Sequence, residues 1–180
     1  MNFVILIGMS CKCFDNKPSF SETDSFDERY KQSKCHCNSR FTVCENKSKF
    51  TIDTKDLTKV DKIKVDSYLD SSPEHQKCDY LFVCTFTDQQ TYIFVELKGK
   101  NIAHAITQIS NTITMFYNNG HLYNKKVIAA IVSSRYPSND GTYRKAKINL
   151  ERSLSSKIKE FRVEKKNVQM TYNPTLDKVS

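Results

Sequence analysis

The stretch CDYLFVCTFTDQQTYIFVELKGK, residues 78–100, decides the fold. Residues 79–86 are apolar at nearly every position, which predicts a central strand buried on both faces. The polar residues 87–90 predict a turn, and residues 91–97 predict a second strand. Because the turn is short, the two strands should pair antiparallel as a hairpin. The start of the first strand then lies beside the end of the second.

A helix and another strand should follow this hairpin. Asn101 can cap the helix, and apolar residues recur at positions 102, 106, 109, 113 and 116, which defines one apolar helix face. The sequence Asn-Asn-Gly at 118–120 should end the helix. Residues 127–132 (VIAAIV) predict a further buried strand. A strand, helix, strand succession forms a right-handed crossover, so this strand should run parallel to the one at 91–97.

The remaining segments give less regular patterns. They predict short strands at 41–43 and 50–52, edge strands at 161–163 and 168–172, and helices at 19–30 and 143–158. At 62–69 apolar and polar residues alternate, which predicts a half-buried strand. Ser19 or Ser21 is the expected cap of the first helix. No repeat or linker divides the chain, so we expect one globular unit of α/β class. In this unit a Cys-rich extension, residues 1–58, should pack on a core formed by residues 59–180.

Charge is distributed unevenly along the chain. The 180 residues include 28 Lys and Arg against 20 Asp and Glu, a formal charge of +8. Residues 1–96 carry 13 basic and 15 acidic side chains, whereas residues 97–180 carry 15 and 5. A polyanionic partner such as nucleic acid would favour this asymmetry, and a solvated basic surface is the alternative. No apolar run reaches the roughly 20 residues that span a bilayer, so we expect no membrane partner.

The apolar run at residues 3–9 has no preceding Lys or Arg and is at the lower limit of length for a secretory leader, so we expect a cytoplasmic protein.

Five of the seven cysteines fall before residue 45. The odd cysteine count argues against a fully paired disulfide framework. Two C-x-C pairs could hold a structural Zn²⁺, although C-x2-C is the commoner spacing, and free thiols are the alternative. The candidate zinc ligands are Cys11, Cys13, Cys35 and Cys37.

Two carboxylates and a lysine should meet at one end of the hairpin. Asp79 opens its first strand, and Glu96 and Lys98 close its second. Glu96 and Lys98 are two residues apart, so they share a face of the sheet. Paired carboxylates suit Mg²⁺ or Mn²⁺, and a neighbouring lysine can orient a water and stabilise the charge of a phosphoryl-transfer transition state. The alternative is that Glu96 and Lys98 end the strand in solvent, paired only with each other.

The sequence has five [DE]-x-K matches, and only residues 96–98 follow an apolar strand and precede a glycine and a helix. The order strand, strand with Asp, strand with Glu-x-Lys, helix, strand over residues 60–134 resembles the core of the PD-(D/E)XK nuclease superfamily. This resemblance implies a restriction-endonuclease-like core, with a β-meander in a mixed sheet, a crossover helix, a parallel fourth strand and flanking helices. Cys78 stands where the family has Pro.

The resemblance also implies roles for individual residues. Asp79 and Glu96 would bind the catalytic Mg²⁺ or Mn²⁺, with the Leu97 carbonyl as a further candidate ligand, and Lys98 would assist the attacking water. Gln108 matches a glutamine that several branches of the family carry on the following helix. An ordinary helix-surface amide is the alternative for Gln108.

Further candidates surround this set. Many members of the family carry an acid on a first helix, for which Glu45 is the preferred candidate over Glu22 and Glu28. Asp66 is another accessory acid, with a solvent-facing strand residue as the alternative. The candidate nucleic-acid-binding residues are Lys100, His104, Lys125, Lys126, Arg135, Arg144 and Lys145.

We therefore expect a metal-dependent endonuclease that hydrolyses phosphodiester bonds in DNA. The choice of DNA rests on the resemblance, which also allows a homodimer or a protein partner. Two alternatives stay open: an inactive module on the same fold that binds nucleic acid or protein, and a zinc-stabilised interaction protein.

Overall fold

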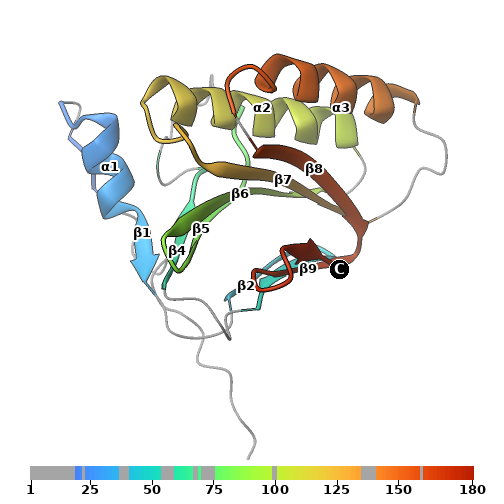
Figure 1. The fold of residues 1–180 in the computed structure, drawn as a ribbon, viewed down its shortest axis with the longest axis horizontal. Coiled ribbons are helices and arrows are strands. Elements are labelled where there is room, and N and C mark those ends of the chain that lie inside the picture. Colours follow the sequence, from blue (N-terminus) through green and yellow to red (C-terminus); the bar gives the residue numbers. More distant parts are fainter. Residues whose placement is uncertain are drawn as a thin grey trace, which may run out of the picture.

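The computed structural model describes residues 19–21, 23–36, 41–53, 59–66, 69, 76–98, 101–134, 141–158 and 160–180. They form a mixed α/β fold with two mixed sheets and three helices (Figure 1). The large sheet has six strands in the order β1 (Lys34–His36), β4 (Lys59–Lys64), β5 (Tyr80–Phe86), β6 (Gln89–Lys98), β7 (Lys126–Ser133) and β8 (Glu160–Asn167). The small sheet has four strands in the order β10 (Lys178–Val179), β9 (Gln169–Asn173), β3 (Ser48–Ile52) and β2 (Phe41–Glu45).

The large sheet is the middle of three layers. Helices α2 (Ile102–Asn118) and α3 (Gly141–Leu154) cover one of its faces, and the small sheet packs on the other (Figure 1). Alternate residues of β6 serve the two interfaces: Phe94 belongs to the core on the helix side, and Ile93 and Val95 belong to the core beneath the small sheet. This double burial explains the nearly continuous apolar run of the central strands.

The predicted hairpin is confirmed. Strands β5 and β6 pair antiparallel with Tyr80 opposite Val95 and Phe86 opposite Gln89. The turn contains Thr87, which has a positive φ of 51°. This register sets residue 79 opposite residue 96, at the end of the hairpin far from the turn.

The predicted crossover is also confirmed. Strand β7 runs parallel to β6, with α2 between them in the chain. Asn101 caps α2, because its Oδ1 accepts a hydrogen bond from His104 N at 3.1 Å. The helix ends at Asn118, and Gly120 follows with a φ of 77°, a conformation that glycine adopts without strain.

Several boundaries differ from the sequence prediction. The strand expected at 62–69 is β4, which lies at Lys59–Lys64, because the chain turns where Leu69 N donates to Val65 O at 3.2 Å. Four consecutive residues of β4, 60–63, are buried, so the half-buried prediction is wrong: both faces of the strand are covered. Helix α3 ends at Leu154, four residues earlier than expected.

The first helix also begins later than expected. Helix α1 (Phe26–Gln32) is capped by Ser25, not by Ser19 or Ser21. Glu28 explains the choice, because its side chain accepts from Ser25 N at 2.8 Å while Glu28 N donates back to Ser25 Oγ at 3.3 Å. This reciprocal capping box satisfies two backbone N–H groups that would otherwise lack partners.

The small sheet joins segments that are far apart in the chain. Strands β2 and β3, which contain the strands predicted at 41–43 and 50–52, form a hairpin, and β3 pairs in parallel with β9. Residues 41–53 therefore share a sheet with residues 169–179, on opposite sides of the division predicted at residue 58. Strand β8 is an edge strand as predicted, whereas β9 is an inner strand of the small sheet. No helix within the described ranges has the length and apolar character needed to cross a membrane.

Candidate functional site

The open end of the β5–β6 hairpin holds Asp79 and Glu96 against each other. Asp79 N donates to Glu96 Oε2 at 3.1 Å, and Leu97 N donates to Asp79 Oδ2 at 2.7 Å. Each carboxylate thus accepts a backbone N–H from the neighbouring strand end. These two bonds take the place of the backbone hydrogen bonds that would continue the β5–β6 pairing, and they fix the positions of the two carboxylates.

Lys98 completes the group. Its Nζ lies 2.6 Å from Glu96 Oε1, and its side chain is 25% exposed while that of Glu96 is fully buried. The Lys98 carbonyl is held as well, by Ser134 N at 2.9 Å and by Ser48 Oγ at 3.3 Å. The ammonium group is therefore the solvent-facing end of a buried ion pair. The prediction that Asp79, Glu96 and Lys98 lie together agrees with this geometry.

Burial governs the protonation of these groups. It raises the pKa of Glu96 to about 8, with a further rise from the charge of Asp79, and it raises the pKa of Asp79 to about 6 despite the Leu97 N–H. Burial alone would lower the pKa of Lys98, but the hydrogen bond and charge of Glu96 outweigh it and raise that pKa. Lys98 is therefore a cation at neutral pH.

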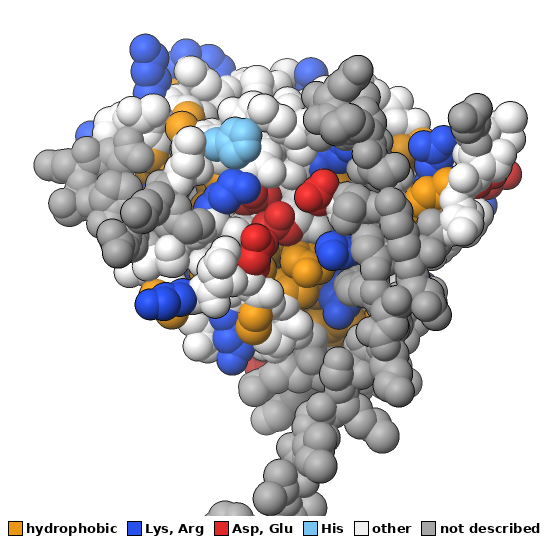
Figure 2. Space-filling view, turned by 180° about the vertical axis from the view of Figure 1, so that it is seen from behind, with side chains coloured by type: hydrophobic (Ala, Val, Ile, Leu, Met, Phe, Trp, Pro, Cys, Tyr) orange, Lys and Arg blue, Asp and Glu red, His pale blue; other side chains and the backbone are white. Residues whose placement is uncertain are grey.

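A pocket of about 300 Å³ opens beside Asp79. It is lined by Cys44, Glu45, Lys64, Asp66, Asp79 and Tyr80. Both accessory acids expected from the sequence, Glu45 and Asp66, are therefore neighbours of Asp79, and their charges contribute to its raised pKa. Glu45 comes from β2 of the small sheet, so both sheets contribute to the pocket. In Figure 2 acidic side chains gather at the middle of one face, with Lys and Arg side chains beside them.

The described residues contain no ready-made group of three or more His, Cys, Asp or Glu side chains that could hold a metal ion. Two carboxylates suffice for Mg²⁺, which usually keeps several waters as ligands. Asp79 and Glu96 are hard oxygen donors, and a cation beside them would favour their ionised forms. The residues present therefore fit a divalent cation bound by this pair, with phosphate oxygens or waters as the other ligands.

Helix α2 holds the segment that leads into Asp79. Thr112 Oγ1 accepts from Cys78 N at 2.9 Å and donates to Gln108 O at 2.9 Å. Gln108 Nε2 donates to Lys77 O at 2.7 Å, and Asn111 Nδ2 donates to Gln76 O at 3.2 Å. Three side chains on one helix face thus bind three consecutive residues, 76–78. The sequence analysis missed Asn111 and Thr112, although both lie within one turn of Gln108.

Gln108 itself is buried, with 9% exposure. Its amide nitrogen, the atom that can donate to a phosphate, is bound to the Lys77 carbonyl. Its Oε1 is buried and has no hydrogen-bond partner among the described residues. This unpartnered Oε1 is an acceptor, which suits a water molecule and not a phosphate oxygen.

The basic candidates separate into two groups. His104 lies in the first turn of α2, and Arg144 and Lys145 lie in the first turns of α3, so these three follow strand ends on the Lys98 side of the sheet. Lys125 and Lys126 lie at the other end: Lys126 is opposite Thr91, seven residues or about 23 Å of strand from Lys98. Lys100 and Arg135 lie outside the described residues.

Three of the four predicted zinc ligands lie outside the described residues: Cys11, Cys13 and Cys37. Cys35, in β1, is disulfide-bonded, and a sulfur in a disulfide is not a thiolate ligand. Cys78 and Cys84 are buried free thiols, as expected for core residues, whereas Cys44 is an exposed free thiol in the pocket. Zinc binding by the first cysteines stays a prediction.

No protein-family model, no curated protein and no solved structure matches this chain.

Thermal stability without metal should fall as the pH rises from 5 to 9. The folded-state pKa values of Glu96 and Asp79, about 8 and about 6, lie above their ordinary values of 4.5 and 3.8. The folded state therefore binds more protons than the unfolded state in this range, and the free energy of unfolding decreases with pH. In EDTA, we expect the melting midpoint, followed by circular dichroism, to fall by at least about 3 °C, or about 1 kcal/mol.

The Glu96→Gln variant serves to assign this slope, because it removes the larger of the two titrations. Its melting midpoint should depend less on pH than that of the wild type, while Glu164→Gln, an acid on β8, should keep the wild-type slope. Equal slopes in all three proteins would contradict the assignment to Glu96.

Loss of the Thr112 hydroxyl should destabilise the fold. Thr112→Val keeps the shape of the side chain but leaves the buried Cys78 N–H without an acceptor, which costs about 1–3 kcal/mol. Urea unfolding measures the difference. Thr107→Val is the matched control, because Thr107 Oγ1 also donates to a carbonyl four residues earlier, Ala103 O, but is exposed and accepts nothing from the segment 76–78. Equal destabilisation by the two substitutions would refute a role for Thr112 in holding this segment.

Proposed function

We propose that this protein is a metal-dependent endonuclease of the PD-(D/E)XK type that hydrolyses phosphodiester bonds in DNA. The observation that carries the proposal is that Asp79, Glu96 and Lys98 lie in contact at the ends of two inner strands of the large sheet. The ammonium of Lys98 lies 2.6 Å from the fully buried carboxylate of Glu96. A strand end that merely faced solvent would not bury Glu96. Charge burial of this kind, beside a pocket rich in carboxylates, is typical of a catalytic site.

The topology around the site supports a restriction-endonuclease-like core. Strands β4, β5 and β6 form an antiparallel meander, α2 crosses over, and β7 returns parallel to β6. This is the order that the sequence resemblance implies. The sheet extends further on both sides, through β1 and β8.

Each residue then has a distinct task. Asp79 and Glu96 hold a Mg²⁺ or Mn²⁺ ion, which when bound supplies positive charge to the phosphate that is attacked. Lys98 is held by Glu96 and is protonated, so it donates hydrogen bonds to the attacking water or to a phosphate oxygen and does not serve as a proton acceptor. Gln108 keeps the segment before Asp79 in place through the Lys77 carbonyl. Glu45 and Asp66 are accessory acids of the pocket.

Nuclease activity is the direct test. Supercoiled plasmid and a labelled single strand are incubated with the protein in Mn²⁺, Mg²⁺ or EDTA. We expect metal-dependent cutting that falls by about 100-fold or more in Glu96→Gln and in Lys98→Ala, since both remove charge that acts on the reacting phosphate. Matched controls are Glu164→Gln and Lys166→Ala, which have the same Glu-x-Lys spacing on β8 and should keep the activity.

The outcomes of this assay separate the alternatives. Binding without cutting in any metal would favour an inactive module on the same fold. Cutting that survives both site substitutions would refute the assignment of the site.

Metal binding can be measured without activity. At pH 8 the melting midpoint of the wild type should rise with millimolar Mn²⁺, because an ion that binds only the folded state stabilises it by RT ln(1 + [L]/Kd). The rise should be absent in Glu96→Gln and present in Glu164→Gln. An equal rise in both variants would show that Mn²⁺ binds elsewhere.

A further inference from the structure

One face of α3 presents cations that no part of the described fold uses. The exposed side chains on this face form the outer α3 face, which consists of Arg144, Lys145, Ile148, Asn149 and Arg152. With Gly141 they line an open depression of about 330 Å³. Positions 144, 148 and 152 are successive turns of one helix face, so Arg144 and Arg152 are about 12 Å apart along the axis.

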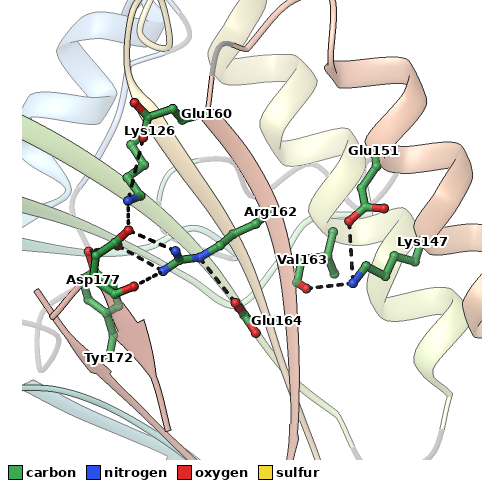
Figure 3. Close-up of polar contacts among 9 residues, drawn as sticks. All are labelled: Lys126, Lys147, Glu151, Glu160, Arg162, Val163, Glu164, Tyr172 and Asp177. Atoms are coloured by element: carbon green, nitrogen blue, oxygen red, sulfur yellow. Dashed lines mark hydrogen bonds and ion pairs between the residues drawn. The ribbon is translucent and has the colours of Figure 1, made fainter.

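Neighbouring cations are used differently. Figure 3 shows Lys147, on the same helix, turned toward Glu151 and the Val163 carbonyl, with Nζ–O distances of 3.6 and 3.3 Å. In the same view Arg162 and Lys126 converge on Asp177, and Arg162 Nη1 lies 3.1 Å from Asp177 Oδ2. Carboxylates of the protein itself thus neutralise these cations, and Lys126 and Arg162 link β7 and β8 to Asp177, the residue before β10.

The outer α3 face has no such compensation. Among the described residues, no carboxylate forms an ion pair with Arg144, Lys145 or Arg152. Glu151, the sequence neighbour of Arg152, is already paired with Lys147, and Asp140, four residues before Arg144, lies outside the described residues. The face therefore carries three exposed positive charges, with Ile148, 45% exposed, as its only large apolar side chain. A surface of this composition binds by charge and not by apolar burial.

Helix α3, which carries this face, follows a strand whose last residue lies beside the candidate site. Lys98 ends β6, Ser133 lies opposite it at the end of β7, and the chain continues from β7 into α3. Helix α3 then runs back beside α2 over the same face of the sheet (Figure 1). The outer α3 face thus extends away from the sheet edge that holds Asp79 and Glu96. In Figure 2 Lys and Arg side chains project at the top of the molecule, which is the side of the helix layer.

We propose that the outer α3 face is a docking surface for the phosphate backbone of DNA, and that it holds the flank of a duplex whose scissile phosphate lies at Asp79, Glu96 and Lys98. This inference rests on the proposed function for the identity of the polyanion. Successive phosphates of one strand are spaced at about 3.4 Å of rise along the duplex axis, so three cations spread over about 12 Å can contact up to three of them. Guanidinium groups bind phosphate through paired N–H donors, which suits Arg144 and Arg152.

Salt-dependent binding tests this surface. The affinity of the full chain for a fluorescein-labelled 20-base-pair duplex is measured by anisotropy in EDTA, between 50 and 300 mM KCl. The triple variant Arg144→Gln/Lys145→Gln/Arg152→Gln should bind at least about tenfold more weakly at 100 mM salt. Its slope of log K against log[salt] should be smaller by about 2–3, because each lost phosphate contact removes about 0.9.

The control variant loses the same three positive charges at positions outside the outer α3 face. Lys31→Gln/Lys59→Gln/Lys178→Gln removes three exposed cations from α1, β4 and β10. It should keep the wild-type slope, and circular dichroism should show that both triple variants are folded. Equal losses in the two variants would mean a general charge effect and would overturn the proposal, as would wild-type binding that the α3 substitutions leave unchanged.

Cutting and binding separate this inference from the proposed function. Duplex binding that depends on the α3 cations, without cutting in Mg²⁺ or Mn²⁺, would support the docking surface and refute the nuclease. Cutting with an unchanged KM in the α3 triple variant would support the nuclease and refute the docking surface.

Discussion

The buried carboxyl group of Glu96 is the constraint on which the rest of the site depends. A carboxylate without contact to water is costly unless partners surround it, and here its two oxygens meet Asp79 N and Lys98 Nζ. Those partners are correctly placed only if β5 and β6 keep their register, because a slip of one residue would turn Glu96 toward the small sheet. The strand register that buries the apolar core therefore also positions Asp79, Glu96 and Lys98 at the strand ends.

Helix α2 and the small sheet hold these strand ends from opposite faces of the large sheet. Helix α2 holds residues 76–78 through Gln108, Asn111 and Thr112, so the loop before Asp79 has little freedom. From the opposite face, Ser48 in the small sheet donates to the Lys98 carbonyl. The two contacts act on the two strands that carry the carboxylates, one strand each. A site held from both faces of a sheet is preorganised in the sense that catalysis requires.

The sequence pattern predicted the hairpin and crossover at residues 79–132 well, and the segments before and after them less well. The hairpin and the crossover rest on long apolar runs and a short turn, which leave few alternatives, and the meeting of Asp79, Glu96 and Lys98 follows from them. The burial of β4 on both faces was missed, because alternation of side chains cannot reveal that a second sheet covers the other face. The cap of α1 was placed wrongly, because the decisive Ser25–Glu28 pair was not recognised. The parallel pairing of β3 with β9, across more than a hundred residues, leaves no signal in either segment alone.

That pairing also orders events during synthesis. Strand β3 has β2 as its neighbour on one side, but its other side stays open until residues 169–173 have been made. A nascent chain that already contains the hairpin, α2 and β7 therefore exposes an unpaired strand edge, of the kind that pairs with other chains. The Lys98 carbonyl accepts one of its two hydrogen bonds from Ser48, in that same unfinished sheet. Assembly of the small sheet is thus a late step with high contact order, and the edge that carries the carboxylates gains its full support only at the end of translation of this segment.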